Sequence, residues 1–318
     1  MLFNEATSQV SRDGEVGFVS KFAEEFEVES LLGEGFFGCV FKAKNRFDGW
    51  NYAMKRIVVA KREQVRALRE IQALVQLDHP GVVRYNHSWI EAPTEEWQSD
   101  ADSKILDKIE QPSSHLMNYA DSDVIIYIQM QLCNYSLEHW LENNKTPDSR
   151  PLSRMKMWFK QMASAVAYIH ERNLIHRDLK PSNIAFVDEN RLKVCDLGIA
   201  TVRREDDDST TMTWRTKIGT PLYQSPEQHY SAPYSSKTDV FSLGLILAEI
   251  CVPMTSNERA KTFGLYRLGR KTDFVAERCP EVVEFVALLT QKQLLRPNCA
   301  EVLVHPFLLD TKCAYCSA

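Results

Sequence analysis

Three oxygen-bearing side chains in one region of the sequence could together carry chemistry. Asp178 and Asn183 lie within residues 175–183, and Asp196 follows after a short interval. Phosphoryl transfer requires an acceptor oxygen for a substrate hydroxyl and a pair of oxygen ligands for Mg²⁺. Residue types and spacing here therefore indicate phosphate chemistry, provided that the fold brings the three side chains together.

The segment between Asn183 and Asp196 predicts the local structure that would do this. Apolar runs at 183–187 and 192–195 flank the polar turn 188–190, which is the pattern of a two-stranded hairpin. Such a hairpin presents Asp178 and Asn183 from a loop and Asp196 from the end of a strand, all toward one cleft.

A glycine-rich turn near the N-terminus could contact phosphate. Gly33, Gly35 and Gly38 lie between two strand patterns, and glycine lets the backbone approach phosphate oxygens without a side-chain clash. The same spacing also occurs in dinucleotide-binding folds, but there a helix follows the turn. Here another strand follows, with Val40 two residues after Gly38, so a phosphate-binding hairpin is favoured.

Lys55 and Glu70 form a candidate ion pair. Lys55 lies in an apolar strand, and Glu70 lies in a predicted helix with apolar residues at spacings of three and four. Pairing with Glu70 would direct Lys55 at the α- and β-phosphates of a nucleotide. The alternative is a surface contact within the helix, such as Arg66 with Glu70.

The composition is that of a soluble globular protein. The chain has 318 residues, of which 44% are hydrophobic and 25% charged, enough for about two domains or lobes. A net charge of −5 gives no overall indication of nucleic-acid binding. The eight cysteines lack a framework spacing, which favours free thiols. No leader or apolar membrane span is recognisable, so a cytoplasmic protein is expected.

Strand patterns come first along the chain and helical patterns second, which predicts an α+β fold with two lobes. We expect a lead-in at 1–25, an N-lobe at 26–133, a C-lobe at 134–310 and a tail at 311–318. Inside the N-lobe, the polar residues 92–123 are expected to form a largely mobile inserted loop with at most one helical turn. The expected strands are 26–32, 39–44, 51–58, 82–91 and 124–133, and the expected helices are 61–77, 137–143, 153–171, 239–251, 282–289 and 298–304.

The motifs resemble those of protein kinases. Residues 175–183 are similar to the catalytic loop, and Asp196-Leu197-Gly198 to the metal-binding motif, with leucine where phenylalanine is commoner. Ser225-Pro226-Glu227 resembles the family's Ala-Pro-Glu, and Arg296 its partner arginine. The resemblance extends from about Phe26 to Leu309 and implies a kinase domain at 26–310, with the antiparallel sheet and one helix in the N-lobe.

The resemblance also implies roles for individual residues. Asp178 would accept or orient the proton of the attacking hydroxyl, and Lys180 would lie near the transferred phosphate, as in serine/threonine kinases. Asn183 and Asp196 would bind Mg²⁺. The residues expected to bind ATP are Leu32, Gly33, Glu34, Gly35, Phe36, Phe37, Gly38, Cys39, Val40, Ala53, Lys55, Glu70, Met130, Gln131 and Cys133.

Several further stretches narrow the resemblance to kinases of the alpha subunit of translation initiation factor 2. These stretches are 51–57, 78–85, 89–93, 127–133, 225–228 and 241–247, and they are most similar to the catalytic domain of the PKR-like endoplasmic-reticulum kinase. The resemblance implies phosphorylation of a serine on that subunit, which lowers translation under stress.

Two positions depart from this group's pattern. Lys21 and Glu25 stand where the group forms a back-to-back homodimer through an arginine and an aspartate. Because lysine lacks the bidentate fork of arginine, we expect a weaker homodimer. In the helix used for substrate docking, Gly264 and Leu265 replace the usual residues and Arg267 is kept.

Three functions therefore remain to be separated. The first is a serine/threonine kinase acting on the initiation factor, and the second is a serine/threonine kinase with a diverged substrate. The third is a non-catalytic kinase-like scaffold, against which the presence of all the candidate catalytic residues argues. For regulation, a phosphate on Thr216 is expected to pair with Arg177 and order the surrounding segment.

Overall fold

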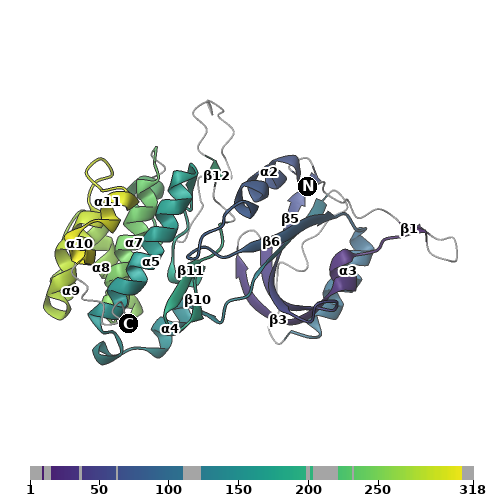
Figure 1. Cartoon of the computed structure of the whole chain (residues 1–318), viewed down its shortest axis with the longest axis horizontal. Coiled ribbons are helices and arrows are strands. Elements are labelled where there is room, and N and C mark those ends of the chain that lie inside the picture. Colours follow the sequence, from purple (N-terminus) through teal and green to yellow (C-terminus); the bar gives the residue numbers. More distant parts are fainter. Residues whose placement is uncertain are drawn as a thin grey trace, which may run out of the picture. The chain divides into compact units, whose positions relative to one another are not determined.

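The computed structural model divides the chain into two compact units (Figure 1). Unit 1 comprises Met1–Asp78 and Arg84–Leu132, and unit 2 comprises His79–Val83 and Cys133–Ala318. The structure describes residues 9–10, 16–35, 38–61, 64–109, 123–197, 201–202, 221–230 and 233–309.

Unit 1 is built on a five-stranded antiparallel sheet. Its strand order is β3-β4-β5-β7-β6. The strands are β3 (Phe26–Gly35), β4 (Gly38–Asn45), β5 (Asn51–Ala60), β6 (Tyr85–Glu91) and β7 (Asp123–Gln131). The remaining elements are β1 (Gln9–Val10), β2 (Val16–Gly17), α1 (Lys21–Glu25), α2 (Gln64–Val75) and α3 (Glu95–Leu106).

The alternation of β4 decides which face of the sheet is buried. Cys39, Phe41 and Ala43 are fully buried at every second position, because successive strand residues point to opposite faces. They pack with Phe22 and Phe26 in the hydrophobic core of this unit. The residues between them, including Val40, therefore point to the other face.

Helix α3 replaces part of the loop that the sequence pattern predicts after β6. Its Asp102 is 1% exposed and forms an ion pair with Arg56 of β5, with 3.1 Å between Oδ2 and Nη2. The side-chain nitrogen of Gln98 donates to the other carboxylate oxygen at 2.6 Å. The expectation of a mobile loop was therefore wrong for residues 95–106, while residues 110–122 lie outside the described part of the chain.

Unit 2 is mainly helical. Its helices are α4 (Leu137–Asn143), α5 (Leu152–Glu171), α6 (Pro226–His229), α7 (Lys237–Cys251), α8 (Ser256–Arg267), α9 (Asp273–Arg278), α10 (Pro280–Thr290), α11 (Cys299–Leu303) and α12 (Pro306–Leu309). Short 3₁₀ turns occur at Pro147–Ser149 and Pro181–Asn183. Its strands are β8 (Tyr135–Ser136), β9 (Leu174–Ile175), β10 (Ile184–Asp188), β11 (Arg191–Val194) and β12 (Thr201–Val202).

The predicted hairpin in unit 2 is present and packs against a long helix. Strands β10 and β11 pair antiparallel, as expected from the polar turn between their apolar runs. Gln161 of α5 brackets this turn, because its amide nitrogen donates to the carbonyl of Asn190 and its oxygen accepts from the amide of Leu192. Figure 1 shows the hairpin beside the helices of the unit. The catalytic-loop residues therefore precede a well-supported pair of strands.

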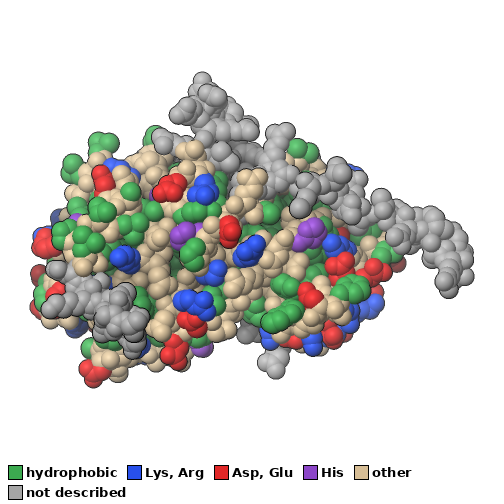
Figure 2. Space-filling model, viewed as in Figure 1, with side chains coloured by type: hydrophobic (Ala, Val, Ile, Leu, Met, Phe, Trp, Pro, Cys, Tyr) green, Lys and Arg blue, Asp and Glu red, His purple; other side chains and the backbone are tan. Residues whose placement is uncertain are grey.

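The α+β class predicted from the sequence is confirmed, with a five-stranded antiparallel sheet and a helical region. The main departures from the expected elements in unit 2 are α8 and α9, which the apolar patterns did not predict. On the face seen in Figure 2, side chains of both charges are interspersed among the described residues. None of the helices in the described ranges combines the length and apolar character needed to span a bilayer.

Candidate active site

The candidate catalytic loop of unit 2 runs from the end of β9 to the start of β10. His176, which is fully buried, orients it with both ring nitrogens: Nε2 lies 2.9 Å from the carbonyl oxygen of Cys195, and Nδ1 lies 3.3 Å from the amide nitrogen of Asp178. The carbonyl can only accept and the amide can only donate, so the ring carries its proton on Nε2. This histidine ties the loop to the residue that precedes Asp196.

Asp178, Lys180 and Asn183 are brought together. The Lys180 ammonium lies 3.1 Å from Oδ2 of Asp178, and the Asn183 side-chain nitrogen donates to the same oxygen at 3.2 Å. Asn183 also donates to the Asp178 carbonyl oxygen at 2.8 Å. Asp178 is 9% exposed and Asn183 6%, so the carboxylate is held in one orientation inside a largely dry site. Such fixation is what an acceptor for a hydroxyl proton needs.

Asp196 follows β11 in an unusual backbone conformation. Its φ of 55° lies in the left-handed region, which non-glycine residues adopt rarely and most often at functional positions. The next residue, Leu197, is fully buried, so leucine fills an apolar position here as phenylalanine could. Gly198 lies outside the described residues.

The donor set of this loop suits a hard divalent cation. Asn183 uses its side-chain nitrogen to hold Asp178, so the amide oxygen is the atom it can offer to a metal. Among the described residues, no group of three or more His, Cys, Asp or Glu side chains could hold a metal. Magnesium is commonly bound by only one or two carboxylates together with substrate phosphates, and Asp196 with Asn183 fits that pattern.

One face of the unit 1 sheet carries several of the predicted nucleotide-binding residues. Val40 of β4 is the Cα partner of Lys55, and Ala53 of β5 is the Cα partner of Met130. Directly opposed residues share a face, as do residues two apart in one strand. These four side chains therefore lie on the same face, and Lys55 is 6% exposed there.

Cys39 does not belong to that face. Its side chain is fully buried in the hydrophobic core of unit 1, and burial raises the pKa of its thiol to about 11. Its predicted part in nucleotide binding can therefore rest only on its backbone, and it stays a prediction. Cys39 and Val40 are consecutive residues of β4, and consecutive strand residues point to opposite faces of the sheet.

The glycine turn is a tight hairpin. Gly35 and Gly38 are Cα partners at its end, and Gly38 has a φ of 136°, which is accessible to glycine but strained for other residues. Leu32, Gly33 and Glu34 lie in β3, where the register shifts between Leu31 and Gly33. Phe36 and Phe37 lie outside the described residues.

The remaining predicted nucleotide-binding residues are Glu70, Gln131 and Cys133. Glu70 lies in α2, but its side chain is outside the described part, so its pairing with Lys55 stays a prediction. The backbone N–H of Gln131 donates to the Arg84 carbonyl at 2.9 Å and is therefore not available to the adenine base of a nucleotide. In unit 2, a hydrogen bond between two thiols lowers the pKa of Cys133 and raises that of Cys195.

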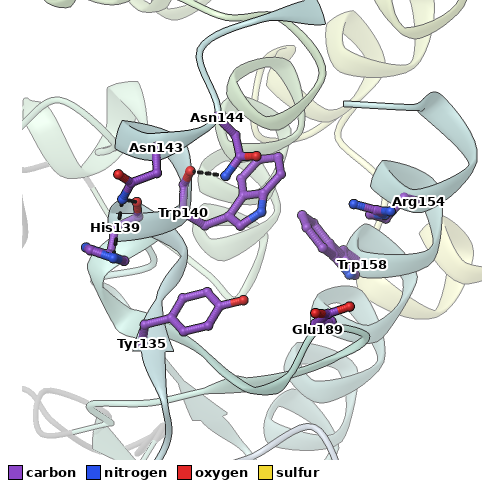
Figure 3. Close-up of a pocket in the computed structure, with 8 residues that line it drawn as sticks. All are labelled: Tyr135, His139, Trp140, Asn143, Asn144, Arg154, Trp158 and Glu189. Carbon is purple, nitrogen blue, oxygen red and sulfur yellow. Dashed lines mark hydrogen bonds between the residues drawn. The ribbon is translucent and has the colours of Figure 1, made fainter. Parts of the chain in front are cut away.

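A separate pocket of about 390 Å³ lies in unit 2 between β8, α4, α5 and the β10–β11 turn (Figure 3). Aromatic rings and polar side chains line it, and Figure 3 shows the Trp158 ring extending into it from α5. The lining residues are Tyr135, His139, Trp140, Asn143, Asn144, Arg154, Trp158 and Glu189. None of the predicted site residues is among them, so this pocket is distinct from the candidate active site.

The structure adds supporting residues that motif reasoning did not single out. The Gln228 side-chain nitrogen of α6 donates to the carbonyl of Arg177 at 2.9 Å. Gln228 also completes a capping box with Ser225 at the start of α6. The spacing of Ser225 and Gln228 signals a capping box, but nothing in it indicates the contact with the catalytic loop.

Comparison with known proteins gives consistent matches. A family model described as the protein kinase domain matches residues 26–308. The interferon-induced, double-stranded RNA-activated protein kinase of Rattus norvegicus is 37% identical over 288 residues, which cover 89% of this chain and 52% of the relative. The eIF-2-alpha kinase GCN2 of Schizosaccharomyces pombe is 30% identical over 373 residues, covering 90% of this chain and 23% of the relative.

A third relative is the eukaryotic translation initiation factor 2-alpha kinase pek-1 of Caenorhabditis elegans. It is 26% identical over 492 residues, covering 94% of this chain and 45% of the relative. The chain thus spans about half or less of the length of these relatives. Two of the three are named as initiation-factor kinases and the first as an RNA-activated protein kinase, so placement nearest the endoplasmic-reticulum type stays a prediction.

Proposed function

The chain belongs to the protein kinase family and is a protein serine/threonine kinase, and from this premise we propose that its acceptor is a serine on the alpha subunit of translation initiation factor 2. The observation that carries the catalytic part is the fixation of Asp178 by Lys180 and Asn183. The relatives named as eIF-2-alpha kinases support the acceptor.

Unit 2 supplies the groups that act on the acceptor hydroxyl. Asp178 accepts or orients the hydroxyl proton, because its carboxylate is held in place by two donors on one oxygen. Lys180 places a positive charge beside that carboxylate, where it offsets negative charge on the transferred phosphoryl group.

ATP and a divalent metal ion are the co-reactants that a protein kinase domain implies. We assign the metal as Mg²⁺, with the amide oxygen of Asn183 and the carboxylate of Asp196 as its protein ligands. When bound, the ion offsets the charge of the phosphates. The fixed Asn183 amide supports this assignment, because the same side chain positions Asp178 and leaves its oxygen as the ligand.

Unit 1 supplies the residues proposed to bind the nucleotide. Val40, Ala53 and Met130 present apolar surface to the base, and Lys55 contacts the α- and β-phosphates from the same face of the sheet. The backbone of the Gly35–Gly38 turn covers the phosphates. Glu70 of α2 is the proposed partner that orients Lys55.

A diverged protein substrate is the second candidate, and the sequence of α8 favours it. Gly264 occupies a position in α8 where a Cβ would meet no atom within 4 Å, so packing does not require glycine there. The change from the expected docking residues to Gly264 and Leu265 could therefore change which protein docks on α8.

A back-to-back homodimer through α1 is also proposed, with a weaker contact than in relatives that use arginine. Lys21 and Glu25 are 3.9 Å apart within the same helix, and the Lys21 ammonium lies 4.9 Å from the centre of the Trp89 ring. Both side chains are partly exposed. In a dimer, Lys21 and Glu25 would pair with Glu25 and Lys21 of the second copy instead of with each other.

Regulation through Thr216 remains a prediction, since residues 203–220 lie outside the described part of the chain. Arg177 is a suitable ion-pair partner for a phosphate. Its Nε is buried without a hydrogen-bond partner among the described residues, and its guanidinium lies 5.3 Å from the centre of the Tyr234 ring. A phosphopeptide map of active protein without phosphate at 210–220 would refute this mechanism. A cytoplasmic location likewise stays a prediction from composition.

The decisive experiment offers purified alpha subunit and radiolabelled ATP to the purified chain. Wild type should label the subunit, and Asp178→Ala should not. Equal labelling by both proteins would leave only the scaffold function. A subunit with its target serine replaced should not be labelled; if it is, the acceptor lies elsewhere and the diverged-substrate function is favoured.

A further inference from the structure

The pocket between β8, α4, α5 and the β10–β11 turn has a volume of about 390 Å³, within the range of small-molecule sites in proteins. All of its lining residues belong to unit 2, so its shape is set within one compact unit. The proposed functions of Asp178, Asn183 and Asp196 do not use it. The side chains around it therefore decide which kind of ligand it fits.

Aromatic rings form one wall of the pocket and hold one another in place. The Trp140 and Trp158 rings meet edge to face, with 4.8 Å between their centroids. Trp158 contacts Phe186 of β10 in the same way, also at 4.8 Å, and the Tyr135 ring lies 4.9 Å from that of Phe186. Because these rings pack against one another, they offer a preformed surface to an aromatic group.

The indole nitrogen of Trp158 has no hydrogen-bond partner in the described part of the chain, although Trp158 is only 1% exposed. Buried N–H groups in folded proteins are nearly always paired, and the indole nitrogen can only donate. Trp158 extends into the pocket from α5 (Figure 3). A bound molecule with an acceptor oxygen would supply the missing partner.

Two opposite charges lie at the mouth of the pocket. Arg154 of α5 and Glu189 of the β10–β11 turn are exposed, and neither side chain has an ion-pair or hydrogen-bond partner among the described residues. The neighbouring Asp188, in contrast, pairs with Arg191. Figure 3 shows Arg154 and Glu189 on the same side of the pocket as Trp158. A ligand that carries an anion and a cation close together would pair with both.

The α4 side of the pocket disfavours a second anionic group. The side-chain nitrogen of Asn143 donates to the His139 carbonyl at 2.7 Å, and that of Asn144 donates to the Trp140 carbonyl at 2.8 Å. With the nitrogens engaged, the amide oxygens are the atoms that these two residues can offer to a ligand. A phosphate or a dicarboxylate would meet acceptor oxygens here, whereas a neutral ring would not be repelled.

We propose that this pocket binds a free aromatic α-amino acid, with its ring against Trp140 and Trp158 and its carboxylate and ammonium groups on Arg154 and Glu189. A zwitterion matches the two unpaired charges, because its two ionised groups are attached to the same carbon. One carboxylate oxygen is then available to accept from the Trp158 nitrogen. The site lies apart from the candidate active site, so this inference does not rest on the proposed function.

The test is equilibrium dialysis of the purified chain with radiolabelled L-phenylalanine, together with the melting temperature. We expect saturable binding and a rise in melting temperature, because a ligand that binds only the folded state stabilises it. Three analogues each lack one group: L-alanine the ring, phenylpropionate the ammonium and phenylethylamine the carboxylate. Each should compete at least about tenfold less well, since charge-assisted hydrogen bonds and aromatic burial both contribute to affinity.

Arg154→Ala and Glu189→Gln each remove one charge from the mouth of the pocket. Each should weaken binding about tenfold or more, with melting temperatures of the free proteins near wild type because both side chains are exposed. Arg270→Ala and Glu142→Gln are the matched controls, since both residues are exposed, belong to unit 2 and do not line the pocket. These two variants should bind L-phenylalanine as wild type does.

Three results would overturn the proposal. The first is no saturable binding up to about 10 mM, where a ligand of this size that makes all three contacts should occupy the site. The second is equal competition by any one of the analogues, because the group it lacks is then not recognised. The third is wild-type affinity in Arg154→Ala or Glu189→Gln, which would place the amino acid elsewhere on the chain. None of these measurements involves phosphoryl transfer, so they are independent of the test of the proposed function.

Discussion

Asp239 of α7 accepts hydrogen bonds from the backbone amides of both His176 and Arg177. Its Oδ2 lies 2.9 Å from the His176 nitrogen, and its Oδ1 lies 2.8 Å from the Arg177 nitrogen. Arg177 has a φ of 71°, in the left-handed region. One carboxylate therefore stabilises a backbone conformation that arginine would otherwise rarely adopt, directly before Asp178.

The Asp239 carboxylate is buried, but its surroundings favour the ionised form. The carboxylate is 1% exposed, and burial alone would raise its pKa. The hydrogen bond from His170, at 2.7 Å, the electrostatic interactions with His170 and His176 and the backbone amide of Arg177 outweigh burial, so the pKa of Asp239 lies below its ordinary value. A depressed pKa means that the stabilisation is present at neutral pH and is lost only as the pH falls below about 4.

Replacement of Asp239 by asparagine should therefore disrupt the catalytic loop. The amide has one acceptor oxygen for two backbone donors, so at least one buried N–H loses its partner, at a cost of about 1–3 kcal/mol. We expect a lower melting temperature and a loss of phosphoryl transfer larger than the loss of ATP binding. Differential scanning calorimetry and a kinase assay measure both; unchanged activity would show that the loop does not depend on this contact.

The buried ion pair between Glu227 and Arg296 gives a second prediction, about stability. The pair is 2.6 Å apart with side chains 8% and 0% exposed, and Arg296 also donates to the carbonyl of Lys237 at 2.7 Å. Removal of the cation in Arg296→Met leaves a buried carboxylate unpaired, which typically costs about 3–5 kcal/mol. Chemical denaturation should show this loss.

The matched control for that prediction is an exposed pair in the same unit. Lys271 and Glu284 are 54% and 78% exposed, and solvent screens such pairs almost completely. Lys271→Met should leave the unfolding midpoint near wild type. Similar losses from both substitutions would mean that burial is not what makes the Glu227–Arg296 pair important.

Apolar patterning predicted the helices and strands that are anchored by apolar residues and missed α3, which is anchored by polar ones. The β10–β11 hairpin and α5 follow from apolar runs and an apolar stripe, and both were predicted close to their bounds. Helix α3 was missed because its anchoring residue Asp102 is polar and pairs with a buried arginine far away in sequence, while Gln98 donates to the same carboxylate. Thr94 followed by two glutamates was the available local signal, since it is the pattern of a capped N-terminus.

The candidate site shows the same division. Asp178, Lys180 and Asn183 lie so close in sequence that one loop had to bring them together, and motif spacing predicted the group. The support from Gln228 and Asp239 depends on contacts between distant segments, which hydropathy and spacing do not reveal. Motif spacing also does not show that the Cys39 side chain lies in the core while that of Val40 does not, because alternate residues of a strand face opposite sides.

The ion pair of Asp102 with Arg56 predicts a specific pH dependence. Burial raises the pKa of Asp102 from 3.8 to about 6, although Arg56 and Gln98 act in the opposite direction. The folded protein therefore binds this proton more tightly than the unfolded chain does. Its contribution to stability is fully present below about pH 4 and is lost as the pH rises through about 6.

The measurement is the difference in melting temperature between wild type and Asp102→Asn at pH 7.5 and pH 5. Since asparagine does not titrate, wild type should gain relative to the variant at the lower pH. Asp100→Asn is the control on the same helix, because Asp100 is 67% exposed and pairs with Lys104. A wild-type advantage that shrinks on acidification would contradict the raised pKa of Asp102.

Two glycines of the nucleotide-binding turn should respond differently to the same substitution. Gly38 has a φ of 136°, and an added Cβ would overlap the carbonyl oxygen of Arg56. Gly33 has no atom within 4 Å of such a Cβ. Gly38→Ala should therefore strain the backbone by about 1–3 kcal/mol, lower the melting temperature and raise KM for ATP, because the turn can no longer approach the phosphates. Gly33→Ala should melt near wild type. Equal stability of the two variants would show that β4 relaxes around the methyl group, and the geometry of Gly38 would then not be what the turn depends on.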